Sequence, residues 1–181
     1  MVERTTYLLV DGENIDATLG NQILGRRPRP EERPRWDRVL QYAERAFDQP
    51  VSGLFFLAAG TDLPTPFVQA LLAIGYRPIP LSGSGKVVDI AIQRTVEVLV
   101  GREADVVLVS HDGDFLPQVE QLCDGIRNVG VIGFGEFVNA GFRGLPGLRI
   151  VDLELDVQAF NVPLPRIRVI DIDDFDPLDF L

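Results

Sequence analysis

The chain has 181 residues, of which 46% are hydrophobic, and its formal net charge is −10 at pH 7. This length suits one domain with a well-buried core, and no apolar run approaches the roughly 20 residues that span a bilayer. A single cysteine excludes an intrachain disulfide and a thiolate metal cluster. The N-terminus shows no signal-peptide pattern, so we expect a cytoplasmic protein with no membrane partner.

The charge is unevenly distributed along the chain. Residues 151–181 hold eight acids and two arginines, whereas residues 26–45 hold seven arginines and four acids. Net charge therefore neither supports nor excludes a nucleic-acid partner. An arginine-rich loop beside a metal-loaded acidic cleft would still attract phosphate.

Apolar runs and amphipathic stretches alternate from the N-terminus onward. Strands are predicted at residues 6–11, 51–59, 76–81, 105–110, 129–134 and 148–153. Helices are predicted at residues 14–23, 35–47, 62–74 with Asp62 as cap, 88–100 and 115–126 with Asp112 or Asp114 as cap. The proline-rich segment 25–34 is predicted to lack regular structure, and segment 135–147 to be a loop or broken helix.

Strands that alternate with helices predict right-handed βαβ units. We therefore expect an α/β fold: a three-layer, doubly wound, mostly parallel sheet of order 3-2-1-4-5. The two prolines of strand 76–81 place it at an edge. Residues 1–153 are expected to form the domain, and residues 154–181 an acidic C-terminal extension, which reads as a disordered solubilising end, a docking segment for a protein partner or an RNA mimic.

Acidic side chains follow the strands at one edge of this sheet. Asp11 ends the first strand, Asp112 and Asp114 follow the fourth, and Asp89 opens the helix leading into that strand. In open α/β sheets ligands bind at the carboxyl ends of the strands, at the point where the strand order reverses. Helix capping and macrodipole compensation are alternative roles for each acid taken singly. Together they predict a hard-cation site for Mg²⁺ or Mn²⁺.

Basic and other polar residues flank these acids. Segment 82–86 (SGSGK) fails as a P-loop, because the earlier glycine and the following Ser/Thr are missing. Lys86 is instead expected to reach phosphate or to be solvated. The arginine loop, with Arg26 and Arg27, either follows a nucleic-acid backbone or is a solvated loop. His111 is expected to be structural or to support the side chains that bind the ion. Cys123 is expected to be a mid-helix core residue, and Trp36 to lie in the core or to stack a base.

Three motifs in this order resemble the NYN domain of the PIN-like nuclease superfamily: VDGEN at 10–14, KVVD at 86–89 and SHDGDF at 110–115. The resemblance covers about residues 7–153. It implies a doubly wound parallel sheet and metal-dependent RNA cleavage. By motif match it assigns metal binding to Asp11, Asp89, Asp112 and Asp114. It makes Asn14 a polar helper and Ser110 a contact to phosphate or to the metal ligands.

The chain departs from that family pattern at two positions. Val88 stands where many members have glycine, and Thr95 stands where many carry a further acid. The leading hypothesis is a ribonuclease acting on single-stranded RNA with Mg²⁺ or Mn²⁺. The alternative is a catalytically weak NYN module that binds RNA or a regulatory protein. A homodimer is left open, and a toxin-like nuclease silenced by a partner is a third interpretation.

Overall fold

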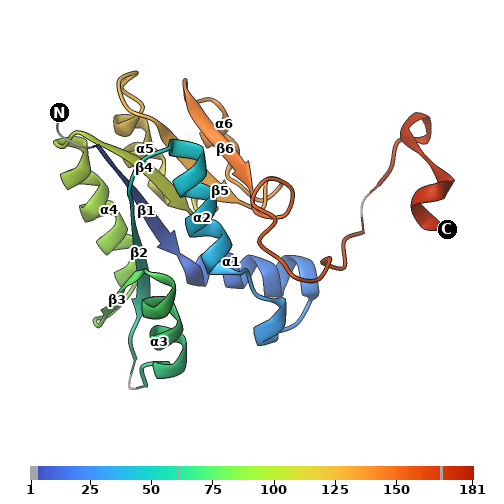
Figure 1. Cartoon of the computed structure of the whole chain (residues 1–181), viewed down its shortest axis with the longest axis horizontal. Helices are drawn as coiled ribbons and strands as arrows, with labels where there is room; N and C mark the ends of the chain where they lie inside the picture. The colour runs from blue at the N-terminus through green and yellow to red at the C-terminus, as the bar shows by residue number, and fades with distance from the viewer. Residues whose placement is uncertain (1–3, 61, 168) are drawn as a thin grey trace.

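The computed structural model describes residues 4–60, 62–167 and 169–181. Residues 1–3 and Thr61 of the expected domain and Arg168 of the tail lie outside this part. The chain folds into one six-stranded sheet with helices on both faces (Figure 1). The strands are β1 Thr5–Asp11, β2 Val51–Ala58, β3 Arg77–Leu81, β4 Ala104–Val109, β5 Val129–Gly133 and β6 Leu148–Asp152. The helices are α1 Gly12–Thr18, α2 Trp36–Phe47, α3 Thr65–Ile74, α4 Val87–Val100, α5 Leu116–Leu122 and α6 Ala140–Arg143.

The sheet is parallel throughout and has the order β3-β2-β1-β4-β5-β6. The predicted order 3-2-1-4-5 and the α/β class are confirmed, and β6 adds a strand beside β5. The proline-bearing β3 lies at one edge, as predicted, because proline cannot donate to a strand on each side. The strand order reverses between β1 and β4, so the carboxyl ends of these two strands form the switch point.

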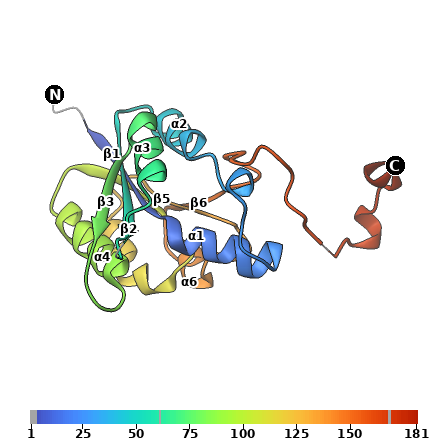
Figure 2. The ribbon, with the colours of Figure 1, turned by 90° about the horizontal axis from the view of Figure 1, so that it is seen from below.

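Two apolar layers cover the two faces of the sheet. One layer joins alternate residues of β1, such as Leu8 and Val10, to α1, α2 and α3. The other joins Leu9 to α4, α5 and α6. Figure 2 shows α2 and α3 on the opposite side of the sheet from α4 and α6. Because successive side chains of a strand point to opposite faces, one apolar strand supplies both layers.

Helix boundaries differ from the sequence prediction in several places. The first helix begins at Gly12 and continues into a wider π-helical turn, Leu19–Leu24. The third begins at Thr65, and Asp62 does not cap it. Within the segment predicted to be irregular, Pro30–Glu32 forms a 3-10 turn, because proline fixes the dihedral angle that a first helical position needs.

The predicted helix 115–126 is also too long. A 3-10 turn, Gly113–Phe115, precedes α5, which ends at Leu122. Asp124 stops it, since its side chain accepts hydrogen bonds from the backbone N–H groups of Ile126 and Arg127. The prediction of a mid-helix Cys123 is therefore wrong: it follows the helix and is half-buried.

The chain continues to pack on the body beyond β6. Val157 and Ala159 are 4% and 0% exposed and lie in the first apolar layer. The packed body therefore includes residues after 153, and the predicted domain boundary at residue 153 stays a prediction. The last residues, with short 3-10 turns at Ile172–Asp174 and Pro177–Phe180, project away from the body in both views (Figures 1 and 2). Within the described residues, no helix is long and apolar enough to cross a membrane.

Candidate metal centre

Asp11 is the buried end of the site. The register pairs Val10 of β1 with Val109 of β4, so Asp11 and Ser110 leave the sheet side by side. The Ser110 hydroxyl donates a hydrogen bond of 2.9 Å to Asp11 Oδ2. Asp11 precedes α1, but its side chain makes no capping hydrogen bond. The Asp11 carboxylate is therefore held by Ser110, at the end of the neighbouring strand.

The environment of Asp11 disfavours its charged form. The residue is 3% exposed, and this burial raises the pKa of its carboxyl group to about 6. The nearby negative charges of Asp89 and Asp112 raise the pKa further, while the hydrogen bond from Ser110 partly offsets the increase. A nearby cation would relieve both effects at once.

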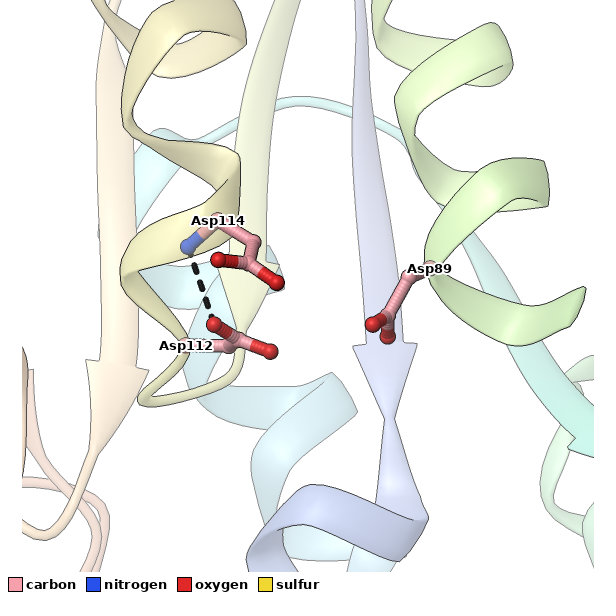
Figure 3. A group of neighbouring side chains, drawn as sticks. All are labelled: Asp89, Asp112 and Asp114. Carbon is pink, nitrogen blue, oxygen red and sulfur yellow. Dashed lines mark hydrogen bonds between the residues drawn. The ribbon is translucent and has the colours of Figure 1, made fainter. Parts of the chain in front are cut away.

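Asp112 and Asp114 lie on the tight turn that follows β4. Asp112 caps the turn, because its Oδ1 accepts a hydrogen bond of 2.9 Å from the Asp114 backbone N–H (Figure 3). The Asp112 N–H in turn donates to the Ser110 hydroxyl at 3.2 Å. Capping uses one carboxylate oxygen of Asp112 and leaves the other for a ligand, so the capping role and the site role coexist.

Asp89 faces these two acids from the first turn of α4 (Figure 3). One oxygen from each of Asp89, Asp112 and Asp114 lies within 4.8 Å of the others. The pKa of Asp89 is raised, first by partial burial and then by the charge of Asp112. Three carboxylates at this spacing repel each other unless a positive charge lies among them.

Lys86 supplies positive charge in this structure. Its Nζ is 3.0 Å from Asp114 Oδ2 and 3.7 Å from Asp89 Oδ2, and these carboxylates raise the pKa of its ammonium group. The Lys86 side chain is exposed, and it lies at the end of the glycine-rich loop that precedes α4. It therefore can swing away from the acids without any loss of core packing.

A cleft of about 360 Å³ brings the predicted residues together. Asp11, Asn14, Lys86, Asp89 and Asp112 all line it. Asp114 stands outside this lining and meets the cleft through its contact with Lys86. Asp11 lines the cleft but is not part of the group of three whose oxygens lie within 4.8 Å. We call this space the acidic cleft.

Asn14 and His111 support the turn that carries Asp112. Asn14 Oδ1 accepts a hydrogen bond of 2.8 Å from the His111 backbone N–H. The His111 ring is buried, and Nε2 accepts from the Phe134 backbone N–H at 2.8 Å. Nδ1 must then carry the ring proton, which it donates to Thr18 Oγ1 at 3.1 Å. Burial lowers the pKa of His111 to about 4, so the ring is neutral and structural.

The two predicted arginines lie in different surroundings. Arg26 is bound by Glu32 through two hydrogen bonds, of 2.8 and 2.5 Å, and lines neither cleft. Arg27 lines a second cleft, which adjoins the acidic cleft. Among the described residues, the Arg27 guanidinium has no hydrogen bond or ion pair.

Comparison with known proteins identifies the family of this chain. The NYN domain family matches residues 5–143, most of the chain. The chain belongs to the NYN domain family. No curated protein matches it. Its fold is similar to the crystal structure of a protein of unknown function from Vibrio parahaemolyticus, with a TM-score of 0.67 and 20% identity, over 83% of this chain and 93% of that one.

The NYN match spans all four acids, and the two departures from the family pattern have structural explanations. Val88 is 5% exposed and packs in the second apolar layer. Thr95 donates a hydrogen bond of 2.8 Å from its hydroxyl to the Ala91 carbonyl, one turn earlier in α4. The Thr95 hydroxyl thus has its hydrogen-bond partner within α4, and the residue offers no carboxylate to the cleft.

One residue of the NYN motif VDGEN was missed in the sequence analysis. Glu13 lines both clefts, and its Oε1 accepts a hydrogen bond of 3.1 Å from the Ala58 backbone N–H at the end of β2. The sequence feature that could have identified Glu13 is its position directly after the junction of β1 and α1, because the first turn of a helix favours an acid.

Proposed function

We propose that this NYN domain protein is a metal-dependent ribonuclease that hydrolyses phosphodiesters of single-stranded RNA at the acidic cleft. The observation that carries the proposal is the group of three carboxylates whose oxygens lie within 4.8 Å of one another at the switch point of the sheet. Ligands bind at this point in open α/β folds, and the family match adds weight because the matched span contains every one of these acids.

The donor set suits Mg²⁺ or Mn²⁺. The acids offer only oxygen ligands, which these ions prefer. Oxygens on opposite sides of a bound Mg²⁺ lie about 4.2 Å apart, since each is about 2.1 Å from the ion. A spread of up to 4.8 Å therefore needs only small side-chain adjustments. The Lys86 ammonium would leave the acids when an ion takes its place.

Each predicted residue then has a role that its surroundings support. Asp89, Asp112 and Asp114 would hold the ion, with Asp11 contacting it from the buried side. A bound divalent ion supplies an activated water and stabilises the charge of the leaving oxygen. Lys86, once released from Asp114, is positioned to contact a phosphate oxygen.

Four further residues were predicted to act at the site. Ser110 orients Asp11 through its hydroxyl, and Asn14 holds the turn through its carbonyl oxygen, leaving its amide group for water or substrate. Arg27 is available for a phosphate, whereas the ion pair with Glu32 makes Arg26 a structural residue of its loop.

A catalytically weak NYN module that binds RNA or a regulatory protein is the second candidate function. The contacts of Lys86 with Asp89 and Asp114 favour it, because a lysine can neutralise acids that no longer bind a metal. Thr95, with its hydroxyl bound inside α4, leaves no further acid there. Such a module would bind RNA equally well with or without divalent ions.

The deciding experiment compares Asp112→Asn with the wild type on single-stranded RNA in Mn²⁺. We expect cleavage to fall by at least about 100-fold and Mn²⁺ binding, measured by calorimetry, to weaken. Asp48→Asn makes the same chemical change at an exposed position outside the acidic cleft, and it should leave both unchanged. Equal cleavage by wild type and Asp112→Asn would refute the assignment of the site. RNA binding with the same affinity in the presence and absence of EDTA would favour the second function.

Other expectations about this protein remain proposals. A cytoplasmic location, a homodimer and a protein partner for the acidic tail are each testable independently of catalysis.

A further inference from the structure

A second, larger cleft of about 730 Å³ adjoins the acidic cleft. Glu13 and Ala58 line both spaces, so the two clefts adjoin at the ends of β1 and β2. Its volume is within the range of small-molecule sites in proteins. We call it the aromatic cleft, because Trp36, Phe55 and Phe67 lie in its wall.

The aromatic wall begins one residue from Asp11. A Cβ on Gly12 would lie 2.5 Å from Phe55 Cζ, so the Phe55 ring packs directly on the backbone that follows the acid. Trp36 and Phe67 meet Phe55 edge-on, with ring centroids 5.0 and 5.5 Å away. A flat apolar group bound here would therefore lie directly beside the metal centre.

Two arginines and two acids line the aromatic cleft, and among the described residues Arg27 is the one of these four whose side chain has no hydrogen-bond or ion-pair partner. Arg33 is neutralised by Asp16 at 2.7 Å, and Glu13 is held by the Ala58 N–H. Arg27 is exposed and, in the part of the chain that the structure describes, has no partner of its own. A guanidinium can bind a phosphate through two hydrogen bonds or stack on a planar ring.

We propose that the aromatic cleft is a nucleobase subsite, which holds the base of a nucleotide next to the phosphate bound in the acidic cleft. The proposal rests on the proposed function for the identity of the ligand. Phe67 and the neighbouring apolar wall pack against the base, and Arg27 binds the adjoining phosphate or the face of the base. Because every base has an aromatic face, such a subsite tolerates different sequences.

The acidic tail is the competing occupant. Residues 169–181 carry five acids among exposed apolar side chains such as Phe175 and Leu178. Both views show this segment projecting away from the body (Figures 1 and 2), and none of its residues lines the aromatic cleft. The nucleobase is favoured because the aromatic cleft adjoins the acidic cleft, where the phosphate is proposed to bind.

Trp36 provides a direct test, because it is the single tryptophan of the chain and lies in the wall of the aromatic cleft. We would titrate full-length Asp112→Asn protein, which should not cleave, with hexauridylate and with an abasic hexamer carrying the same phosphates. We expect hexauridylate to quench Trp36 fluorescence and to bind about tenfold more tightly than the abasic hexamer.

Matched variants in the Asp112→Asn background test which side chains of the aromatic cleft contact the base. Phe67→Ala and Arg27→Ala should each weaken hexauridylate binding by about five- to tenfold, and Phe67→Ala should not affect the abasic hexamer. Leu72→Ala, at an exposed position of the same helix as Phe67, and Arg45→Ala, at the far end of the helix that Trp36 begins, should have no effect.

The outcomes separate this proposal from the proposed function. Equal binding of the two hexamers, or an equal loss for both in Phe67→Ala, overturns the nucleobase subsite even if wild-type protein cleaves RNA. Failure of wild-type protein to cleave either hexamer in Mn²⁺ overturns the ribonuclease but not the subsite. If a synthetic peptide of residues 169–181 quenches Trp36 and hexauridylate does not displace it, the tail is the occupant and the proposal is wrong.

Discussion

Burial of the charged Asp11 carboxylate destabilises the folded protein, and the hydrogen bond from Ser110 offsets only part of this effect. Its folded-state pKa of about 6 lies above its ordinary value of 3.8 because the carboxyl group is buried. The folded protein therefore binds this proton more tightly than the unfolded chain does. The resulting stabilisation is complete below about pH 3.8 and is lost as the pH rises through 6. At neutral pH the charged form is buried near Asp89 and Asp112 without full compensation.

We therefore predict that Asp11→Asn stabilises the metal-free protein at pH 7. The free energy of unfolding should rise by about 1–3 kcal/mol, since one pKa unit corresponds to about 1.4 kcal/mol, and asparagine still accepts the hydrogen bond from Ser110. Urea denaturation in EDTA at pH 7 and pH 4 measures this, and the gain should shrink at the lower pH. Asp62→Asn, at an exposed position outside the helices, is the control. A variant less stable than wild type at pH 7 contradicts the prediction.

Burial of an acid does not by itself mark a site. Asp105 is 1% exposed at the start of β4, yet its carboxylate accepts hydrogen bonds from Gln49 and from both the backbone and side-chain N–H groups of Asn128. Asp11 receives one side-chain hydrogen bond, at the opposite edge of the sheet. Sequence position at the carboxyl end of a strand distinguishes the two acids, and on that ground the sequence analysis chose Asp11 as a candidate and not Asp105.

At the scale of elements, the junction of β1 and α1 depends on Gly12. We predict that Gly12→Ala lowers the free energy of unfolding by about 1–3 kcal/mol, as overpacking of a filled core does. The added methyl group would lie 2.5 Å from the Phe55 ring, which is 1% exposed and cannot move outward freely. Urea denaturation gives the magnitude, and Trp36 fluorescence reports any shift of the neighbouring ring.

Gly60→Ala is the matched control for this change. A Cβ at Gly60 meets no atom within 4 Å, so the variant should be as stable as wild type or slightly more stable, because alanine restricts the unfolded chain. A smaller partner should rescue the clash: Gly12→Ala combined with Phe55→Leu should lose less stability than the two single changes added together. Strict additivity would show that the Phe55 contact is not the cause.

The sequence predicts the sheet better than the ends of its helices. Apolar runs and the prolines of β3 determine which strands are central and which lie at an edge, and both can be recognised in the sequence. Helix ends depend on turns whose partners are close only after folding. Arg127, for example, donates to the carbonyls of Leu99 and Val100 at the end of α4, and the turn at Asp124 that ends α5 accompanies this contact.

The candidate site was predictable to the same extent. Two strand ends and the start of α4 brought four acids to one end of the sheet, but side-chain partners decide which of them lie closest together. Asp11 accepts a hydrogen bond from Ser110 and is not one of the group of three. Likewise, Glu32 lies six residues from Arg26, and only the 3-10 turn at Pro30–Glu32 brings the two together. Such local pairings are not specified by residue type and spacing alone.

At the scale of the whole molecule, the C-terminal segment has two parts with different roles. Arg166 contacts Glu136 and Glu154 and lies over the rings of Phe134 and Phe137, at 5.4 and 5.9 Å. Phe160 also stacks on Phe134, with ring centroids 5.7 Å apart. The chain up to Arg166 is therefore fastened to the body, whereas residues 169–181 are exposed throughout.

This division predicts opposite results for two changes near the C-terminus. Deletion of residues 169–181 removes five acids but no buried side chain, so the urea midpoint should stay unchanged. Arg166→Ala should lower the free energy of unfolding by about 1–3 kcal/mol, because it removes charge-assisted hydrogen bonds and leaves two carboxylates without that partner. Hydrogen exchange should then rise between residues 153 and 167 and not in β1. Equal losses from both changes would show that the two parts pack as one.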